Sequence, residues 1–199
     1  MNLTINPEDK ILLVGESGSG KSVFLKLIKE LEKPTKGSIE KISEGRLKNI
    51  RYIPQKDFMF EATLDFNISF DQRCDNLSLL KKRVEINNNF PADIELRGEN
   101  LSGGQAKRIA IARGLFCDDS LLLFDEPFQG LSEQQAKTIE KNILINRSPV
   151  IISSHQIYDQ NLKYYNKFFI VKDKNIIVYN TLSEFLECDY YRKNKIDSQ

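Results

Sequence analysis

Cysteine, histidine and long apolar runs are scarce in this sequence, and each scarcity excludes a class of protein. Its 199 residues include three cysteines, one histidine and no tryptophan. Cys74, Cys117 and Cys188 are far apart and odd in number, which argues against a disulfide framework and against a zinc site. We therefore expect reduced thiols, as in the cytosol. No apolar run approaches the roughly 18 residues of a membrane helix, and the first residues lack a signal-peptide pattern.

An excess of charge of either sign is absent as well. The chain has 29 lysines and arginines against 28 acidic residues, which leaves a net charge of +1. Nucleic-acid-binding domains usually carry a basic surface, so we expect no nucleic-acid partner. The length is sufficient for one α/β domain with a full core and a helical insertion.

A glycine-rich loop at residues 15–22 is the first feature that carries chemistry. It fits the pattern G-x-x-x-x-G-K-[ST]. Glycines let such a loop curl until its N–H groups point at phosphate oxygens. Lys21 is expected to neutralise the β- and γ-phosphates, and the Ser22 hydroxyl to ligate Mg²⁺. The candidate nucleotide-binding residues are Gly15, Glu16, Ser17, Gly18, Ser19, Gly20, Lys21, Ser22 and Val23.

The segments on both sides of the loop support this interpretation. Residues 10–14 form a short apolar run that suits a buried parallel strand. Apolar residues between positions 23 and 31 recur at helical spacing, so a helix begins at the loop and directs its positive end at the phosphates. An ordinary Gly/Ser-rich turn would not explain both flanks.

A second apolar run, residues 121–124, ends in Asp125 and Glu126. Acids at the end of a buried strand are costly unless they have a function. Asp125 is suited to hold Mg²⁺ or its waters, and Glu126 to act as general base on the attacking water. Alone, a solvated acidic turn would explain the pair better, but behind a phosphate loop we prefer the catalytic interpretation.

Two further polar residues follow short strands. His155, the only histidine, follows the apolar run that begins at residue 149. Open α/β sheets bind ligands at the carboxyl ends of their strands, which favours a γ-phosphate contact over a structural role. Gln55 follows a short strand that includes residues 51–53, and its amide can reach Mg²⁺ or water. One glutamine by itself predicts nothing.

A second glycine-rich segment lies at residues 101–105 and reads L-S-G-G-Q. One fold does not need two phosphate-binding glycine loops for one triphosphate. The two loops together predict two protein surfaces that close around one nucleotide. The additional candidate nucleotide-binding residues are Ser102, Gly103, Gly104 and Gln105.

In this order, the five segments resemble the nucleotide-binding domain of an ATP-binding cassette (ABC) transporter. Walker A is residues 15–22, the Q-loop residue is Gln55, the signature is 101–105, Walker B is 121–126 and the switch histidine is His155. The resemblance covers essentially the whole chain. It implies hydrolysis of ATP with Mg²⁺, which drives transport by a transmembrane domain of the same or another chain at the cytoplasmic face of a membrane.

The resemblance also assigns roles to the candidate residues. Glu126, His155 and Gln55 are implied to be catalytic, and Ser22, Gln55 and Asp125 to hold the metal. The implied protein partner is a second ABC ATPase domain, identical or different. Residues 55–70 resemble the exporter pattern P-Q-x-x-x-L-F-x-x-T-I-x-x-N-I, which favours export over import.

Three alternatives belong to other classes of protein. An ABC-type DNA-maintenance ATPase normally separates its two glycine motifs by a long coiled coil, and no sustained heptads lie between Ser22 and Leu101. A translation-associated ABC protein usually has two cassettes and basic surfaces, and this sequence shows neither. A binding module without hydrolysis is disfavoured by the intact Glu126 and His155.

We expect one domain with a P-loop NTPase core and a mostly parallel sheet. Residues 1–55 and 106–180 are assigned to the core, and residues 56–104 to a helical insertion. Residues 181–199 are assigned to a C-terminal helix and tail, disordered from position 192. Leu77, Leu80 and Val84 predict a helix in the insertion, Thr181 and Glu184 a capping box, and residues 172–181 resemble the family's late hairpin. The apolar Phe58, Met59, Phe60 and Phe66 are expected to contact membrane helices or to pack under the insertion.

Two features depart from the family pattern. None of the fourteen residues before Gly15 is aromatic, although the family has antiparallel strands there with an aromatic residue that stacks on adenine. These strands are expected to be truncated, so the chain is interpreted as a fragment. Ser132 replaces the aspartate that follows Walker B in the family's D-loop.

Overall fold

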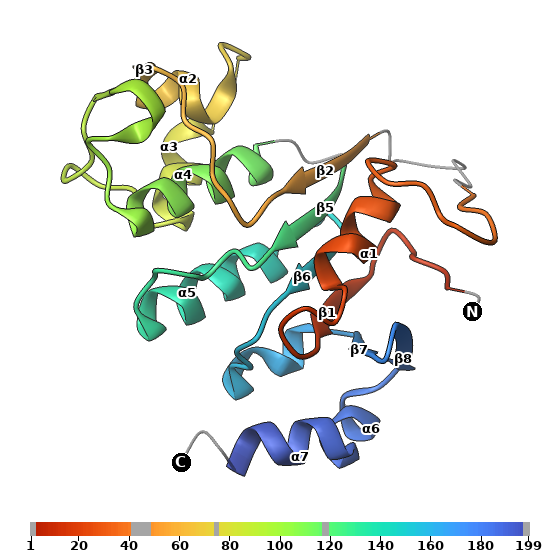
Figure 1. The fold of residues 1–199 in the computed structure, drawn as a ribbon. Helices are drawn as coiled ribbons and strands as arrows, with labels where there is room; N and C mark the ends of the chain where they lie inside the picture. Colours follow the sequence, from red (N-terminus) through yellow and green to blue (C-terminus); the bar gives the residue numbers. More distant parts are fainter. Residues whose placement is uncertain (1–2, 41–48, 74–75, 117–119, 197–199) are drawn as a thin grey trace.

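The computed structural model describes residues 3–40, 49–73, 76–116 and 120–196. It is an α/β fold with a six-stranded sheet and a smaller lobe, the insertion, at one end (Figure 1). The strands are β1 Lys10–Val14, β2 Asn49–Ile53, β3 Ala62–Thr63, β4 Asp93–Ile94, β5 Ser120–Asp125, β6 Val150–Ser153, β7 Lys167–Lys172 and β8 Asn175–Tyr179. The helices are α1 Lys21–Ile28, α2 Leu64–Ser69, α3 Leu77–Arg83, α4 Gly103–Leu115, α5 Glu133–Leu144, α6 Leu182–Glu187 and α7 Asp189–Ile196, and the 3-10 helices are η1 Leu96–Gly98 and η2 Asp159–Tyr164.

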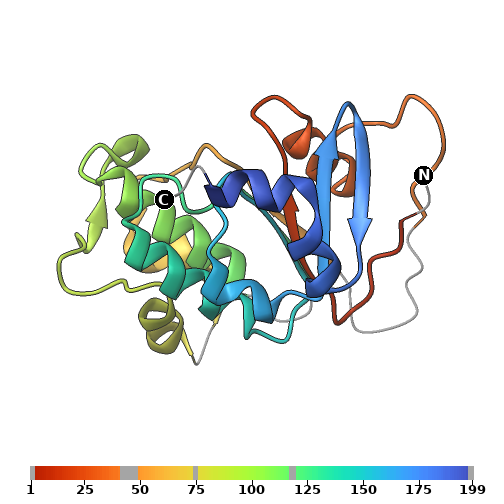
Figure 2. The same ribbon diagram turned by 90° about the horizontal axis from the view of Figure 1, so that it is seen from below.

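The main sheet has the strand order β2-β5-β6-β1-β7-β8. All neighbours pair in parallel except β7 and β8, which form an antiparallel hairpin at the end opposite the insertion (Figure 2). The mostly parallel sheet is therefore confirmed. The late hairpin is present too, but it begins at Lys167 and ends at Tyr179, whereas residues 172–181 were expected. Because β1, β5 and β6 are parallel neighbours, their carboxyl ends meet at one edge, where the phosphate loop begins.

The sheet separates two apolar cores. Ile11 and Leu13 of β1 pack with Leu25 of α1 on one face. Leu12 and Val14 belong to the other core, which also contains buried residues of α4, α5 and α6. Successive side chains of a strand point to opposite faces. A strand covered on both faces therefore has the continuous apolar sequence observed at residues 10–14.

The insertion packs against helix α4. It contains the two-stranded ribbon β3–β4 and the short helices α2 and α3, both of which contact α4. The helix predicted from Leu77 and Leu80 is confirmed as α3. Residues 104 and 106, between which the predicted division of insertion and core falls, both lie in helix α4. This helix contacts α2 and α3 of the insertion as well as β2 of the core.

The end of the chain also differs from the prediction. A disordered tail was expected from residue 192, but α7 continues to Ile196. Tyr191 is buried, its ring centroid lies 5.5 Å from that of Phe185, and its hydroxyl donates to Asp159 Oδ1 over 2.9 Å. Tertiary packing thus orders a polar helix that would be marginal alone. The last three residues of the expected tail lie outside the described part.

The predicted capping box is present at the start of α6. Thr181 Oγ1 accepts from the Glu184 N–H over 3.2 Å, and the Glu184 carboxylate accepts from the Thr181 N–H over 3.3 Å. Cys188 is a buried free thiol, whereas Cys74 and Cys117 lie outside the described residues. Among the helices that the structure describes, none combines the length and the apolar character needed to cross a bilayer.

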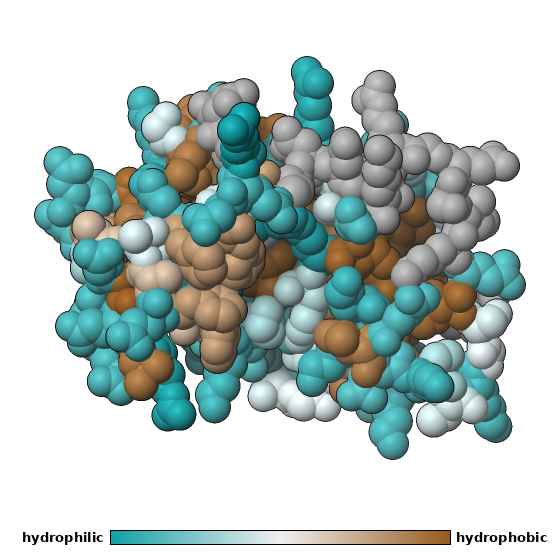
Figure 3. Space-filling model, turned by 90° about the horizontal axis from the view of Figure 1, so that it is seen from above, coloured by the Kyte–Doolittle hydropathy of each residue, from teal (hydrophilic) through white to brown (hydrophobic). Residues whose placement is uncertain are grey.

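The apolar segment of the insertion is divided between core and surface. Met59 is 3% exposed, whereas Phe58 and Phe60 are 60% and 39% exposed. Phe66 is half-buried and, like Phe70, packs edge-to-face on Phe60. Figure 3 looks at the molecule from above the view of Figure 1 and shows apolar surface over the end where the insertion lies. Met59 therefore packs inside the molecule, whereas the contact of the exposed phenylalanines with membrane helices stays a prediction.

Candidate nucleotide-binding site

The phosphate loop connects the end of β1 to the start of α1. Gly15 has a φ of 154°, and a Cβ there would lie 2.6 Å from the carbonyl oxygen of Val171. A side chain at this position would displace the backbone of β7. Gly20 precedes α1 in a left-handed conformation with a φ of 110°, which an L-residue rarely adopts. The two glycines therefore allow the close turn that the sequence pattern predicts.

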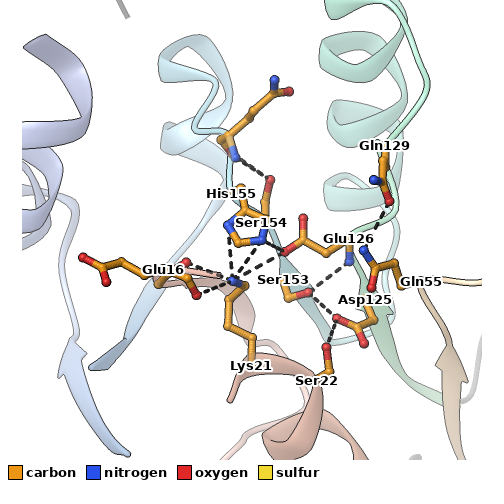
Figure 4. Close-up of polar contacts among 12 residues, drawn as sticks. Glu16, Lys21, Ser22, Gln55, Asp125, Glu126, Gln129, Ser153, Ser154 and His155 are labelled. Carbon is orange, nitrogen blue, oxygen red and sulfur yellow. Dashed lines mark hydrogen bonds and ion pairs between the residues drawn. The ribbon is translucent and has the colours of Figure 1, made fainter. Parts of the chain in front are cut away.

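Lys21 is 5% exposed and is the first residue of helix α1, at the end of the loop. Its ammonium donates to the carbonyl oxygens of Gly15 and Glu16 over 2.8 and 3.2 Å (Figure 4). Glu126 Oε1 lies 3.6 Å away. Burial lowers the pKa of Lys21, and the negative charges of Glu126 and Asp125 oppose that shift. The loop and Walker B thus hold a cation where phosphate oxygens are expected.

Asp125 is 2% exposed at the end of β5. Its Oδ1 accepts from the hydroxyls of Ser22 and Ser153 over 3.0 and 2.8 Å. Its Oδ2 accepts from the hydroxyl of Tyr52 over 2.9 Å. Ser22 and Asp125, which are far apart in the sequence, are therefore direct neighbours, as expected for two metal-holding residues.

Glu126 and His155 form the next part of the cluster. His155 Nε2 lies 3.0 Å from Glu126 Oε1, and both ring nitrogens lie 3.4 Å from Lys21 Nζ. Glu126 has a φ of 51°, and its N–H donates to the carbonyl and hydroxyl oxygens of Ser153 over 3.2 and 3.0 Å. A non-glycine residue rarely adopts a left-handed conformation. Where one does, the residue often belongs to a functional site.

Gln55 lies at the border of this cluster. Its side-chain amide donates to Gln129 Oε1 over 3.2 Å. Within the described part of the chain, no hydrogen bond joins the Gln55 side chain to Asp125 or Ser22. The proposed metal role of Gln55 therefore requires a movement of its side chain or of its loop.

The signature segment lies apart from the phosphate loop of its own chain. No hydrogen bond or ion pair joins residues 102–105 to residues 15–23, all of which are described. Ser102 caps helix α4 in a capping box with Gln105, whose side chain also donates to the Asn89 carbonyl over 3.0 Å. Gln105 is thus used within its own chain, whereas Ser102 and Gly103 are exposed at the helix start.

Two D-loop positions also have structural roles. Ser132 caps helix α5 in a capping box with Gln135. A Cβ on Gly104 would lie 2.9 Å from the carbonyl oxygen of Gly130, so the start of α4 packs closely on this loop. The serine that replaces the family's aspartate therefore preserves the helix start.

Several residues of the cluster were not found from the sequence. Tyr52, Ser153 and Gln129 contact predicted site residues, but their spacing gives no local signal. The capping box between Ser102 and Gln105 could have been predicted from the sequence, because S-x-x-Q at the start of a helix is a known capping pattern.

The residues present fit a nucleoside triphosphate with bound Mg²⁺. The hydroxyl of Ser19 is buried without a hydrogen-bond partner among the described residues, and a phosphate oxygen would satisfy it. A serine hydroxyl and a carboxylate are the oxygen donors that Mg²⁺ prefers, with phosphates and waters as further ligands. Among the described residues, no group of three or more His, Cys, Asp or Glu side chains could hold a metal ion without other ligands.

Comparisons with known proteins agree with this geometry. One relative is the lactococcin-G-processing and transport ATP-binding protein LagD of Lactococcus lactis. It is 32% identical over 177 residues, which cover 79% of this chain and 25% of LagD. The uncharacterised ABC transporter ATP-binding protein YfiB of Bacillus subtilis is 30% identical, with 100% of this chain and 38% of YfiB covered. This chain thus spans less than half the length of these curated relatives.

A solved structure of a bacterial Atm1-family ABC exporter with ATP bound has the same fold. The TM-score is 0.80 at 22% identity, with 98% of this chain and 37% of that chain covered. A family model described as ABC transporter matches residues 1–129, which contain the phosphate loop, the signature segment and the Walker B acids. The chain therefore belongs to the ABC transporter family.

Proposed function

We propose that this chain binds and hydrolyses ATP, and that hydrolysis drives export by a transmembrane domain of the same or another chain. The main support is the convergence of Lys21, Ser22, Asp125, Glu126 and His155 at one edge of the sheet in a member of this family. Two relatives are named as processing and transport ATP-binding proteins for lactococcin G and for sublancin-168, and these names favour export. The place of action is then the cytoplasmic face of a membrane.

Each residue of the cluster has a separate role in this proposal. Lys21 and the loop N–H groups bind the β- and γ-phosphates. Ser22, Asp125 and Gln55 hold Mg²⁺, which neutralises charge on the phosphate oxygens when it is bound. Glu126 accepts the proton of the attacking water, and His155 contacts the γ-phosphate and orients the Glu126 carboxylate.

The signature segment is proposed to act on the nucleotide of a second ABC ATPase domain. Helix α4 is thirteen residues long and begins at Gly103 with Ser102 at its exposed start. The positive end of a helix and its free N–H groups favour a phosphate. Closure of two domains would bring this helix start to the partner's γ-phosphate and exclude water.

The contact with the transmembrane domain is proposed to use the exposed aromatic cluster of the insertion, which consists of Phe58, Phe60, Phe66 and Phe70. Its rings pack edge-to-face with centroid distances of 4.8 to 6.0 Å. An exposed patch of this kind is typical of a protein–protein contact. The cluster lies near Gln55 in the sequence, so contact there can affect the nucleotide site.

The DNA-maintenance alternative has less support. Between positions 22 and 101, α1 ends after eight residues and the longest further helix in the described part is α3, with seven. An inserted coiled coil would need helices of several heptads. The relatives reported above are also transport proteins by name.

The test is Glu126→Gln. An amide cannot accept the water's proton, so phosphate release should fall by about 10² or more while ATP binding is retained. Size-exclusion chromatography should then detect an ATP-stabilised dimer. Glu133→Gln, which changes an exposed glutamate of α5, serves as the control. Phosphate release by Glu126→Gln at the native rate would exclude Glu126 as the general base.

A further inference from the structure

Helix α4 carries a buried cation that the nucleotide site does not use. The charged residues that are buried in the described part are Asp9, Lys21, Lys107, Asp125 and Glu140. Lys21 and Asp125 belong to the nucleotide site. Lys107 is 3% exposed and lies in helix α4, five positions after the signature residue at 102. A buried ammonium needs partners, and the identity of those partners indicates its role.

The partners of Lys107 lie in the segment that carries Gln55. Its Nζ donates to the main-chain carbonyl oxygen of Gln55 over 2.7 Å. It also lies 3.1 and 3.0 Å from Oδ1 and Oδ2 of Asp57, whose side chain is 13% exposed. All three contacts join one ammonium to one short segment. They therefore fix the main chain of that segment to helix α4.

Stability alone does not explain this choice of residues. Well-packed apolar side chains usually stabilise a protein as much as a buried ion pair does. What the Lys107–Asp57 pair adds is a fixed position for the Gln55 main chain. The side chain of Gln55 makes one exposed amide contact, to Gln129, so the main chain largely determines where its amide lies.

We propose that Lys107 is a positioning residue that makes the Gln55 amide follow the movement of the signature helix. This inference rests on the proposed role of Gln55 at the metal. The start of helix α4 would contact the nucleotide of a partner domain. Through Lys107, the same helix would position Gln55 in the nucleotide site of its own chain. The Lys107–Asp57 pair would thereby couple the two nucleotide sites of a pair of domains.

A double-mutant cycle tests this proposal in the full chain. The variants are Lys107→Met, Gln55→Ala and the combination. Two quantities are measured: the kcat of ATP hydrolysis, and the Mg²⁺ concentration that half-saturates thermal stabilisation by ATP. Each single variant should change both by about tenfold or more, as for other residues that support a metal ligand. The combination should be no worse than Gln55→Ala, because Lys107 acts through Gln55.

A second comparison separates positioning from folding. The double variant Lys107→Met/Asp57→Leu replaces the buried pair by apolar side chains and should regain most of the unfolding temperature. It should not regain kcat. Lys167→Met is the matched control, because Lys167 pairs with the buried Asp9 over 2.6 Å in a part of the core away from Gln55. It should lower the unfolding temperature and leave the Mg²⁺ requirement unchanged.

Three results would overturn the proposal. Additive losses in the cycle would mean that Lys107 acts independently of Gln55. Recovery of kcat together with stability in Lys107→Met/Asp57→Leu would leave only a packing role. A native Mg²⁺ requirement in Lys107→Met would exclude positioning. Failure of the proposed function is a separate result, namely no phosphate release by the native chain, and the Mg²⁺ measurement does not depend on turnover.

Discussion

At the scale of single residues, Tyr52 has the most specific contact that the sequence does not predict. Its hydroxyl donates to Asp125 Oδ2 over 2.9 Å, while Oδ1 faces Ser22 and Ser153. Burial raises the pKa of Tyr52, and Asp125 raises it further, so the phenol remains a donor throughout the physiological range. The hydroxyl thus holds the carboxylate in the orientation that faces Ser22.

Tyr52→Phe removes this donor and keeps the ring. The free Asp125 oxygen then has no partner, and its rotamer is less restricted. We expect the Mg²⁺ concentration needed for ATP binding to rise about tenfold, with ATP binding in the absence of Mg²⁺ little changed. Nucleotide titration with and without Mg²⁺ measures both quantities.

Tyr191→Phe is the control for that measurement. It also removes a tyrosine hydroxyl that donates to an aspartate, in this case Asp159 over 2.9 Å, in the C-terminal helix. It should reduce stability and leave the Mg²⁺ requirement unchanged. Equal shifts in both variants would show that Tyr52 affects the site only through general stability.

At the scale of elements, a buried carboxyl joins helix α5 to η2. Glu140 is 1% exposed. Its carboxylate accepts from Asn161 Nδ2 over 2.6 Å and from the Tyr165 hydroxyl over 2.7 Å. Burial raises the pKa of Glu140 to about 7, although the two hydrogen bonds oppose the shift. Helix α5 follows the D-loop in the chain, and η2 follows His155.

The raised pKa predicts how stability depends on pH. The folded state binds this proton more tightly than the unfolded state, so the contribution is fully present below the unfolded pKa of 4.5. It is lost as pH rises through the folded pKa of about 7. The free energy of unfolding should therefore decrease by about 3 kcal/mol from Glu140 alone over this interval.

Glu140→Gln tests that contribution. The amide resembles the protonated carboxyl and can pair with both partners, so the decrease between pH 5 and 7.5 should largely disappear. Denaturant unfolding at several pH values measures the slope. Glu133→Gln, on the same helix with a side chain 71% exposed, should retain the native slope. An unchanged slope in Glu140→Gln would assign the pH dependence to other groups.

At the scale of the whole molecule, the two glycine segments lie on separate surfaces of one chain. Lys21 is buried in the phosphate loop, whereas Ser102 is exposed at the start of α4. Their separation is the structural reason to expect a site shared between two copies. A shared site makes a prediction that a site within one chain does not.

Ser102→Arg should leave ATP binding to the isolated chain nearly unchanged and block hydrolysis. Lys21→Ala should weaken phosphate binding directly. A mixture of the two variants forms some pairs in which both defects lie in one site and the other site is intact. The mixture should therefore recover about a quarter of the native turnover if copies exchange freely. Steady-state phosphate release of the mixture, compared with each pure variant, measures this recovery.

Local patterns were sufficient for much of the fold. The strand at residues 10–14, the loop that follows it and helix α1 are adjacent in the chain, and each has a characteristic local sequence. The same is true of the capping box at Thr181. The continuation of helix α7 from residue 192 to Ile196 was missed because its residues are polar. The Tyr191 contact with Asp159 that helps to order it spans 32 positions of the chain.

The sequence by itself determined the residue types of the nucleotide site and their order, because motifs of phosphate chemistry are short and contiguous. Only the tertiary structure decided which distant residues support them. Tyr52 lies 73 positions from Asp125, and Lys107 lies 52 positions from Gln55. Such pairs leave no periodic signal in the chain. They arise because parallel strands end at one edge of the sheet and helix α4 packs across strand β2.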